Sequence, residues 1–316
     1  MHTSDVDAQA RAQPQWRQEY EQISPGRFSG LVHHVQLPGV RLVREDSHCA
    51  LRQRGDLGQQ AYGFALPLAQ SGPAIFNGQR VDGDAVMVGR GDELDFVTPT
   101  HFSLIAVVVD AALLVPLWER LYQKPPSAWL DAQLVLPARP AAAAVLRQMH
   151  LAALRDLAAA GTPWHDNAAL AQLRDALLME WIEALPERVD ASQLPTLAAR
   201  KHLVDRACER MLAGADEPLS MLSVCREVGA SRRKLNYCFQ GVLGTSPVKY
   251  LRAVRLNGVR RELRAGRAGS VQEAAARWGF RHLGQFARDY KQQFGELPSA
   301  TLRGGEAGCG GPPGRK

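Results

Sequence analysis

The sequence predicts an α+β protein: a small antiparallel β-barrel with a helical segment, followed by an all-α double helix-turn-helix domain. Three observations predict this fold. Short apolar runs separated by turn residues fill residues 28–110, an internal repeat fills residues 219–303, and basic charge is concentrated in the repeat. At 316 residues the chain has room for two domains with separate cores.

The N-terminal half shows the texture of short strands. Residues 1–13 are polar and are predicted to be disordered, and Trp16 to Ile23 is predicted to form a short helix that ends at Ser24-Pro25-Gly26. From Phe28 to Asp110, runs such as AYGFALPL and SLIAVVVD alternate with glycine-rich turns, and Asn77-Gly78 is a good hairpin signal. Strands at roughly 10-residue spacing favour a small antiparallel barrel or sandwich.

Two amphipathic helices are predicted after Pro137. Residues Pro140 to Ala160 and His165 to Leu185 are rich in Ala and Leu with helical periodicity. Their apolar faces are broad enough to pack on the barrel and on a second copy of the chain, so a homodimer contact is expected here, with packing inside one chain as the alternative. The predicted boundaries are a disordered N-terminus at 1–13, a domain of strands and helices at 14–190, a linker at 191–198, a helical domain at 199–303 and a disordered tail at 304–316.

The C-terminal repeat has a spacing of 50 residues when it is aligned on Gly229 and Gly279. Each glycine follows a short apolar helix, where a residue that tolerates positive φ turns the chain. With a shift of one residue, the turn that ends at Pro247 matches the turn that ends at Pro298, and each proline begins another helix. The pattern predicts two helix-turn-helix units joined by a long helix, Val248 to Leu263.

Charge is distributed unevenly between the two halves. Residues 1–200 carry a net charge of −5, whereas residues 201–303 carry +10. A basic domain joined to a mildly acidic one indicates a polyanionic partner for the C-terminal part, and a solvated basic surface is the alternative. Together with the repeat, the charge favours double-stranded DNA.

The first recognition helix is predicted to begin at Ser231, a natural N-cap. Leu235, Cys238 and Phe239 form its buried face. Arginine makes a two-pronged match to guanine O6 and N7, and asparagine to adenine N6 and N7. The residues predicted to contact DNA from its first two turns are Arg232, Arg233, Asn236 and Tyr237.

In the second unit the corresponding helix is predicted to begin near Arg281-His282. His282, Gln285 and Arg288 are its predicted DNA-contacting residues, and Arg288 would reach phosphate as easily as a base. Its predicted core residues are Leu283, Phe286 and Tyr290. A rigid helix between the units would present two heads to successive major-groove turns, roughly 34 Å apart.

At these residues the chain resembles the AraC/XylS family of bacterial transcription regulators. The resemblance rests on SRRKLNYCFQGVLGTSPVKYLRAVRLNGVRREL and VQEAAARWGFRHLGQFARDYKQQFGELPS, and covers about 85 residues. It implies seven C-terminal helices with two reading heads, base contacts from Arg233, Asn236 and Tyr237, and DNA contacts from Gln285 and Arg288. Gly284 departs from the family pattern, which usually has Ser there.

The resemblance also implies an activator that works with RNA polymerase and senses a small molecule through a cupin-like N-terminal barrel. Within the family the chain is most similar to regulators of ethanolamine-utilisation operons, which implies ethanolamine acting with adenosylcobalamin as effector; DNA binding itself would need no cofactor. Aromatic and acidic residues would suit a cation pocket, and packing in the barrel core is the alternative role of most of the aromatic residues. The predicted effector-binding residues are Trp16, Tyr62, Phe64 and Phe96, and Phe76, Asp92, Glu93 and Asp95 are further candidates.

Other classes of protein are less favoured by the sequence. A barrel enzyme of the cupin type would need a metal site or a catalytic pair, and His33-His34 point to opposite faces of a strand. A ligand-independent DNA-binding protein is the other alternative. Five scattered cysteines without CxxC pairing favour free thiols in a reducing cytoplasm. The sequence shows no signal segment and no run long enough for a membrane helix, so a cytoplasmic location is expected.

Overall fold

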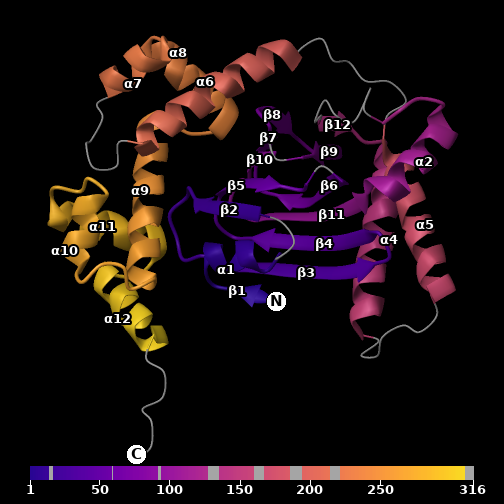
Figure 1. The fold of residues 1–316 in the computed structure, drawn as a ribbon, viewed down its shortest axis with the longest axis horizontal. Helices are drawn as coiled ribbons and strands as arrows, with labels where there is room; N and C mark the ends of the chain where they lie inside the picture. The colour runs from indigo at the N-terminus through magenta and orange to yellow at the C-terminus, as the bar shows by residue number, and fades with distance from the viewer. Residues whose placement is uncertain are drawn as a thin grey trace, which may run out of the picture. The chain divides into compact units, whose positions relative to one another are not determined.

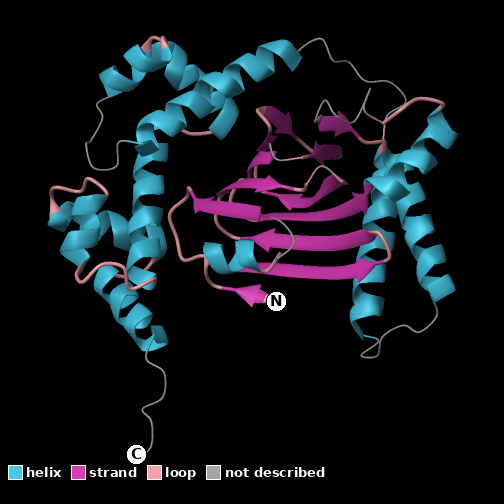
Figure 2. Cartoon of the chain, viewed as in Figure 1, coloured by secondary structure: helices cyan, strands magenta, loops and turns pink. Residues whose placement is uncertain are grey.

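The computed structural model describes residues 1–13, 17–58, 60–91, 94–126, 135–159, 167–185, 194–213 and 221–309. The chain divides into two compact units. The first comprises Met1–Tyr20 and Ser29–Ala198, and the second comprises Glu21–Phe28 and Ala199–Lys316. Figure 1 labels the helices and strands, and Figure 2 shows that strands dominate the first unit whereas the second is built mainly from helices.

The first unit contains two antiparallel sheets. One has seven strands in the order β1-β3-β4-β11-β6-β9-β12, and the other has five in the order β2-β5-β10-β7-β8. The predicted closed barrel does not form in the described part of the chain, because the outer strands β1 and β12 are short and lie at opposite ends of the larger sheet. The strands are β1 His2–Thr3, β2 Arg17–Gln22, β3 Gly30–Leu37, β4 Val40–Ser47, β5 Leu51–Asp56, β6 Ala61–Gln70, β7 Ala74–Phe76, β8 Gln79–Val81, β9 Ala85–Arg90, β10 Leu94–Val97, β11 Phe102–Asp110 and β12 Val135–Pro137.

Helices of the first unit cover one face of the larger sheet, as Figure 1 shows for α4 and α5 beside β3 and β4. Both helices were expected from their periodicity, and their buried Leu and Trp side chains join the strands in one core. Trp181 of α5 packs against Phe64 of β6 with ring centroids 6.4 Å apart. The helices are α1 Val6–Arg11, α2 Ala111–Tyr122, α4 Pro140–Ala159 and α5 Asn167–Ala184.

The N-terminal residues are ordered, contrary to the prediction of disorder for 1–13. Asp5 caps α1 by accepting a hydrogen bond from the backbone N–H of Ala8 at 3.1 Å. Gln9 is fully buried and donates to Glu45 at 3.1 Å, so a polar side chain that suggested a solvated tail has its partner in the sheet. The helix predicted for Trp16 to Ile23 is also wrong, because residues 17–22 form strand β2.

The second unit repeats a short helix, a glycine turn and a longer helix. Gly229 and Gly279 follow the short helices with φ of 67° and 76°, values that glycine adopts without strain. Gly244 and Gly295 end the longer helices in the left-handed conformation. The helices are α6 Leu194–Ala213, α7 Met221–Val228, α8 Arg232–Leu243, α9 Pro247–Arg264, α10 Val271–Arg277, α11 Leu283–Phe294 and α12 Pro298–Cys309.

Residues 21–28 belong to this helical unit, which the sequence did not indicate. The backbone carbonyl of Gln22 accepts hydrogen bonds from Asn257 at 2.9 Å and from Gln293 at 2.8 Å. Both donors are buried, at 2% and 7% exposure, and buried amides need such partners. Arg261 of α9 forms an ion pair with Glu21 at 2.9 Å. The segment therefore completes the packing of α9 and α11.

Candidate nucleic-acid interface

The helix α8 is fixed by its apolar side and capped as predicted. The hydroxyl of Ser231 accepts a hydrogen bond from the backbone N–H of Lys234 at 3.2 Å. Leu235, Cys238 and Phe239 are 1%, 3% and 0% exposed, and the Phe239 ring packs on Tyr250 of α9 with centroids 6.0 Å apart. The packing determines which residues of α8 face solvent.

The four predicted contact residues of the first helix-turn-helix all lie on the solvent face of α8. Arg232, Arg233, Asn236 and Tyr237 are exposed, and among the described residues neither Arg233 nor Asn236 has a side-chain hydrogen bond or ion pair. Tyr237 is 61% exposed, with the Arg200 guanidinium of α6 5.2 Å from its ring centroid. The face thus offers donors in the first turns of a helix, the arrangement by which helix-turn-helix proteins read base edges.

The second recognition helix, α11, differs from the first in its polar face. His282, Gln285 and Arg288 are exposed as predicted. However, Gln285 donates to Asp289 at 2.8 Å and accepts from Arg288 at 3.0 Å, and Asp289 is also paired with Arg252 of α9. The polar side chains of α11 are therefore joined in a chain of hydrogen bonds before any ligand binds.

The apolar side of α11 confirms two of its three predicted core residues. Phe286 and Tyr290 are 1% and 0% exposed, whereas Leu283 is 41% exposed and is not a core residue. Leu283 is the first residue of the helix, and its side chain remains exposed there. A Cβ placed on Gly284 would meet no atom within 4 Å, so the serine usual at this position would fit without steric conflict.

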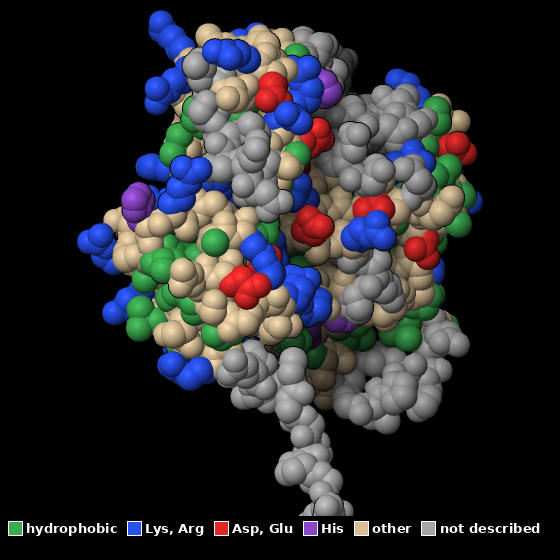
Figure 3. Space-filling view, turned by 60° about the vertical axis from the view of Figure 1, so that its left-hand side comes forward, with side chains coloured by type: hydrophobic (Ala, Val, Ile, Leu, Met, Phe, Trp, Pro, Cys, Tyr) green, Lys and Arg blue, Asp and Glu red, His purple; other side chains and the backbone are tan. Residues whose placement is uncertain are grey.

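The connecting helix α9 uses most of its arginines to hold the unit together. Arg252 pairs with Asp289, Arg260 pairs with Glu296 at 2.8 Å, and Arg261 pairs with Glu21. Arg255 is half-buried, and desolvation lowers its pKa. Figure 3, which turns this unit toward the viewer, shows many Lys and Arg side chains and few Asp and Glu on its surface. The exposed basic surface is therefore drawn mainly from other parts of the unit.

The short helix α10 is anchored on α9 through a tryptophan. Trp278 donates from Nε1 to Glu262 at 3.0 Å. Its ring covers Gly258, where an added Cβ would lie 2.3 Å from a ring carbon. Such separations do not occur between real atoms, so the close approach of ring and backbone requires glycine.

Only some of the predicted effector-binding residues lie at the same cavity. Phe64 and Phe96 line a cavity in the first unit, together with Phe76. Tyr62 does not line it; its ring is 2% exposed in the main core, with the Arg90 guanidinium 4.7 Å from the ring centroid. Trp16, Asp92 and Glu93 lie outside the described residues.

Two features of the cavity run against the acidic residues proposed from sequence. Asp95 is buried in a two-pronged pair with Arg52, at 2.9 and 2.7 Å, so its charge is already matched. Glu45, which sequence reasoning missed, lines the cavity instead. The alternation of side chains along a strand could have identified Glu45: on β4 it lies on the same face as the buried Val43, two residues earlier.

The arrangement of α7, α8, α10 and α11 defines a helix-turn-helix DNA-binding domain, and comparison with known proteins agrees. Residues 224–304 match the helix-turn-helix domain family. The "Probable thc operon regulatory protein" of Rhodococcus erythropolis is 45% identical over 103 residues, which are 32% of this chain and 31% of that protein. The "XylDLEGF operon transcriptional activator" of Pseudomonas putida is 44% identical over 75 residues, 23% of each chain.

A solved structure described as a probable AraC family transcriptional regulator from Rhodopseudomonas palustris CGA009 is 34% identical. It covers 33% of this chain and 97% of its own, with a TM-score of 0.31. Residues 224–304 of this chain therefore carry a helix-turn-helix domain. The chain spans about a third or less of the length of the curated relatives described above.

The described residues lack two features, a membrane-spanning helix and a cluster of metal ligands. None of the helices in that part of the chain is long and apolar enough to cross a membrane. Among the same residues, no group of three or more His, Cys, Asp or Glu side chains is placed to hold a metal ion.

Proposed function

We propose that the chain is a sequence-specific, double-stranded-DNA-binding transcription regulator that acts as an activator under the control of a small effector. The observation that carries the proposal is the solvent face of α8, where Arg233 and Asn236 stand without partners among the described residues. The helix-turn-helix domain of residues 224–304 and the name of the Pseudomonas putida activator support it.

The DNA-binding part is tested by selecting the purified full chain on randomised duplex DNA. Enrichment of a motif, bound at least a hundredfold more tightly than a scrambled duplex of the same composition, is expected of a specific binder, for which ratios of roughly 10³ or more are typical. Equal affinity for both duplexes across a salt series would overturn sequence-specific binding, because phosphate contacts alone carry no base information.

The regulatory part needs RNA polymerase and an effector. In transcription reconstituted from a promoter that contains the selected motif, the chain is expected to raise the yield of transcript with bacterial RNA polymerase. Ethanolamine with adenosylcobalamin stays the effector implied by resemblance, and each compound is added separately and together. Transcript yield that is unaffected by the chain at every promoter carrying the motif would contradict the role of activator.

A homodimer through α4 and α5 is part of the proposal. Val145 of α4 is 43% exposed, so an apolar side chain remains on the outer surface of this pair of helices. Sedimentation of the full chain at micromolar concentration is expected to give a dimer, and Val145→Glu should shift it toward the monomer because a buried charge is costly. A monomer at all concentrations would contradict the dimer.

A further inference from the structure

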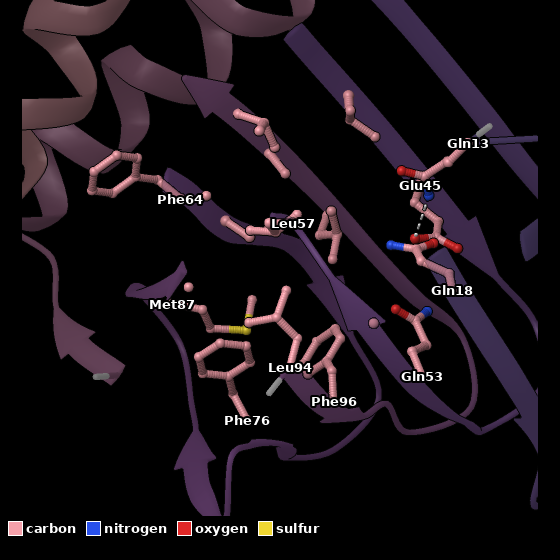
Figure 4. A pocket seen from close by; sticks show the side chains of 18 of the residues that line it. Gln13, Gln18, Glu45, Gln53, Leu57, Phe64, Phe76, Met87, Leu94 and Phe96 are labelled. Carbon is pink, nitrogen blue, oxygen red and sulfur yellow. Dashed lines mark hydrogen bonds between the residues drawn. The ribbon is translucent and has the colours of Figure 1, made fainter. Parts of the chain in front are cut away.

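The first unit contains a partly open cavity of about 110 Å³ between its two sheets. Its wall is divided by chemistry, as Figure 4 shows: Gln13, Gln18, Glu45 and Gln53 gather at one end, and rings and aliphatic side chains surround the other. The apolar end is formed by Leu57, Phe64, Phe76, Met87, Leu94 and Phe96.

Glycines on neighbouring strands make room at the apolar end. Gly63 of β6 pairs with Gly89 of β9. A Cβ on Gly63 would lie 2.6 Å from Leu57, and a Cβ on Gly89 would lie 2.6 Å from Leu94. Both leucines therefore fold down onto glycine backbone, which is a packing arrangement that larger residues would prevent.

At the polar end the side chains present oxygen acceptors. Gln13 is 3% exposed, and its Oε1 has no hydrogen-bond partner in the described part of the chain. Glu45 is 6% exposed and accepts from Gln9 at 3.1 Å and from Tyr20 at 3.2 Å. A buried acceptor without a donor is costly, and it is the kind of atom that a ligand N–H would satisfy.

Within the part of the chain that the structure describes, the carboxylate of Glu45 forms no ion pair with a Lys or Arg side chain. Arg54 also lines the cavity, but its guanidinium pairs with Glu19 at 3.2 Å. Among the described residues, the titratable groups near Glu45 are Tyr20 from β2 and Asp46 from its own strand. The neutral amides of Gln9 in α1 and of Gln13, just after α1, also lie beside it. Desolvation by burial, with a smaller contribution from the charge of Asp46, raises the pKa of Glu45 to about 7.

We propose that this cavity binds a small amphipathic amine, with its ammonium group between Glu45 and Gln13 and its hydrocarbon part against Phe76, Leu94 and Phe96. An ammonium group supplies the donor that Gln13 Oε1 lacks and the positive charge that a buried carboxylate needs. The inference rests on the proposed function in that it names the chemical class of the effector; ligand binding itself can be measured without DNA.

The size of the cavity limits the ligand. An apolar cavity of about 150 Å³ holds benzene, so a cavity somewhat smaller suits roughly four to six non-hydrogen atoms. We therefore choose n-butylamine as probe, n-butanol as its uncharged counterpart and ethanolamine as a counterpart of the same charge without the hydrocarbon end.

Isothermal titration calorimetry of the full chain with each compound at pH 8 tests the proposal. n-Butylamine is expected to bind at least tenfold more tightly than n-butanol and than ethanolamine. Glu45→Gln, which keeps the shape of the side chain, should weaken n-butylamine at least tenfold and leave n-butanol unchanged. Ala106→Leu, on the apolar wall, should weaken both compounds equally.

The pH dependence provides a test that needs no variant. Glu45 must be ionised to pair with the ammonium, and its carboxyl takes up a proton as pH falls below about 7. Affinity for n-butylamine is therefore expected to fall about tenfold per pH unit below that value and to be flat above it, whereas n-butanol should show no such change.

Equal binding of n-butylamine and n-butanol, or a pH-independent affinity for the amine, would overturn the proposal. Tighter binding of ethanolamine than of n-butylamine would overturn the role of the hydrocarbon part. Affinity for the selected duplex without ligand is measured in parallel on wild type and Glu45→Gln. Amine binding without specific DNA binding would refute the proposed role as a DNA-binding regulator and support the amine site. Specific DNA binding without amine binding would refute the amine site alone.

Discussion

The two helix-turn-helix units share a plan but differ in how their recognition helices meet solvent. In the first, Arg233 and Asn236 of α8 are exposed and unpaired within the described part of the chain. In the second, Gln285 and Arg288 of α11 are bonded to each other, and Gln285 is bonded to Asp289. A side chain that is already hydrogen-bonded must lose that bond to contact a base, so its net gain on binding is smaller.

The difference suggests a division of work between the units. The first would read base edges, and the second would position the domain on the backbone while α9 connects them. The packing of Trp278 against Gly258 and the ion pair between Arg252 and Asp289 hold the second helix-turn-helix against α9. We expect the following substitutions to show whether that division is real.

The largest effect is expected from the double variant Arg233→Ala, Asn236→Ala. Two base contacts, each contributing about 1–3 kcal/mol, would be lost, so affinity for the selected duplex should fall by about 2–6 kcal/mol. Fluorescence anisotropy with the selected and the scrambled duplex measures the loss. A fall that is equal on both duplexes would mean that these residues contact phosphate and do not read sequence.

Gly258→Ala should destabilise the packing of the second helix-turn-helix on α9. The added methyl group would overlap the Trp278 ring, and overpacking of this kind costs about 1–3 kcal/mol. Gly241→Ala is the matched control, because Gly241 also lies in a helix and its Cβ would meet no atom within 4 Å. The control should be stabilised by about 0.5–1 kcal/mol.

Urea unfolding followed by circular dichroism gives the stability of both variants, and hydrogen exchange locates the change in the chain. Faster exchange in α9 and α10 is expected for Gly258→Ala. Equal stability of Gly258→Ala and Gly241→Ala would show that Trp278 does not hold α10 on α9.

Gln285→Ala and Arg288→Ala are expected to weaken binding by less than about 1 kcal/mol each, because the residues give up existing hydrogen bonds to reach DNA. Arg288→Ala should also lower the slope of log affinity against log salt by about one, as the loss of one phosphate contact does. A change in the selected motif on either substitution would show that the second unit reads bases as well.

The smallest effect concerns Gly284. Replacement by Ala removes a flexible residue from the first turn of α11 and should stabilise the unit by up to about 1 kcal/mol without altering DNA affinity. Gly284→Ser has the same steric freedom and adds a hydroxyl. A gain in DNA affinity for Ser over Ala, measured side by side, would show that a serine contact can be restored in the second unit; equal affinities would show that it cannot.

The helical unit that contains both helix-turn-helix motifs was predictable because its sequence signals are local. Ser231, Gly229 and Gly279 each act within one turn of chain, and the buried Leu235, Cys238 and Phe239 follow helical periodicity. Leu283 was misplaced because residue type alone does not show where a packing surface ends. The hydrogen bonds of Gln285 and Arg288 depend on rotamers, which the sequence does not determine.

The N-terminal unit of two sheets was harder to predict because the contacts that determine its structure join residues that are distant in sequence. Gln9 and Glu45 lie far apart in the chain and become buried only when α1 packs on β4. Residues 17–22 look helical in composition, yet Tyr20 finds its hydrogen-bond partner across strands, and β2 forms. Tertiary contacts override local propensity in such segments.

The division of work between the two units is tested most directly by repeating the selection on randomised duplex DNA with three proteins: wild type, Arg233→Ala with Asn236→Ala, and Gln285→Ala with Arg288→Ala. We predict that wild type enriches a strongly specified block, that the first double variant loses this block, and that the second double variant retains it with lower overall affinity. Loss of the block in the second double variant and its retention in the first would contradict the account.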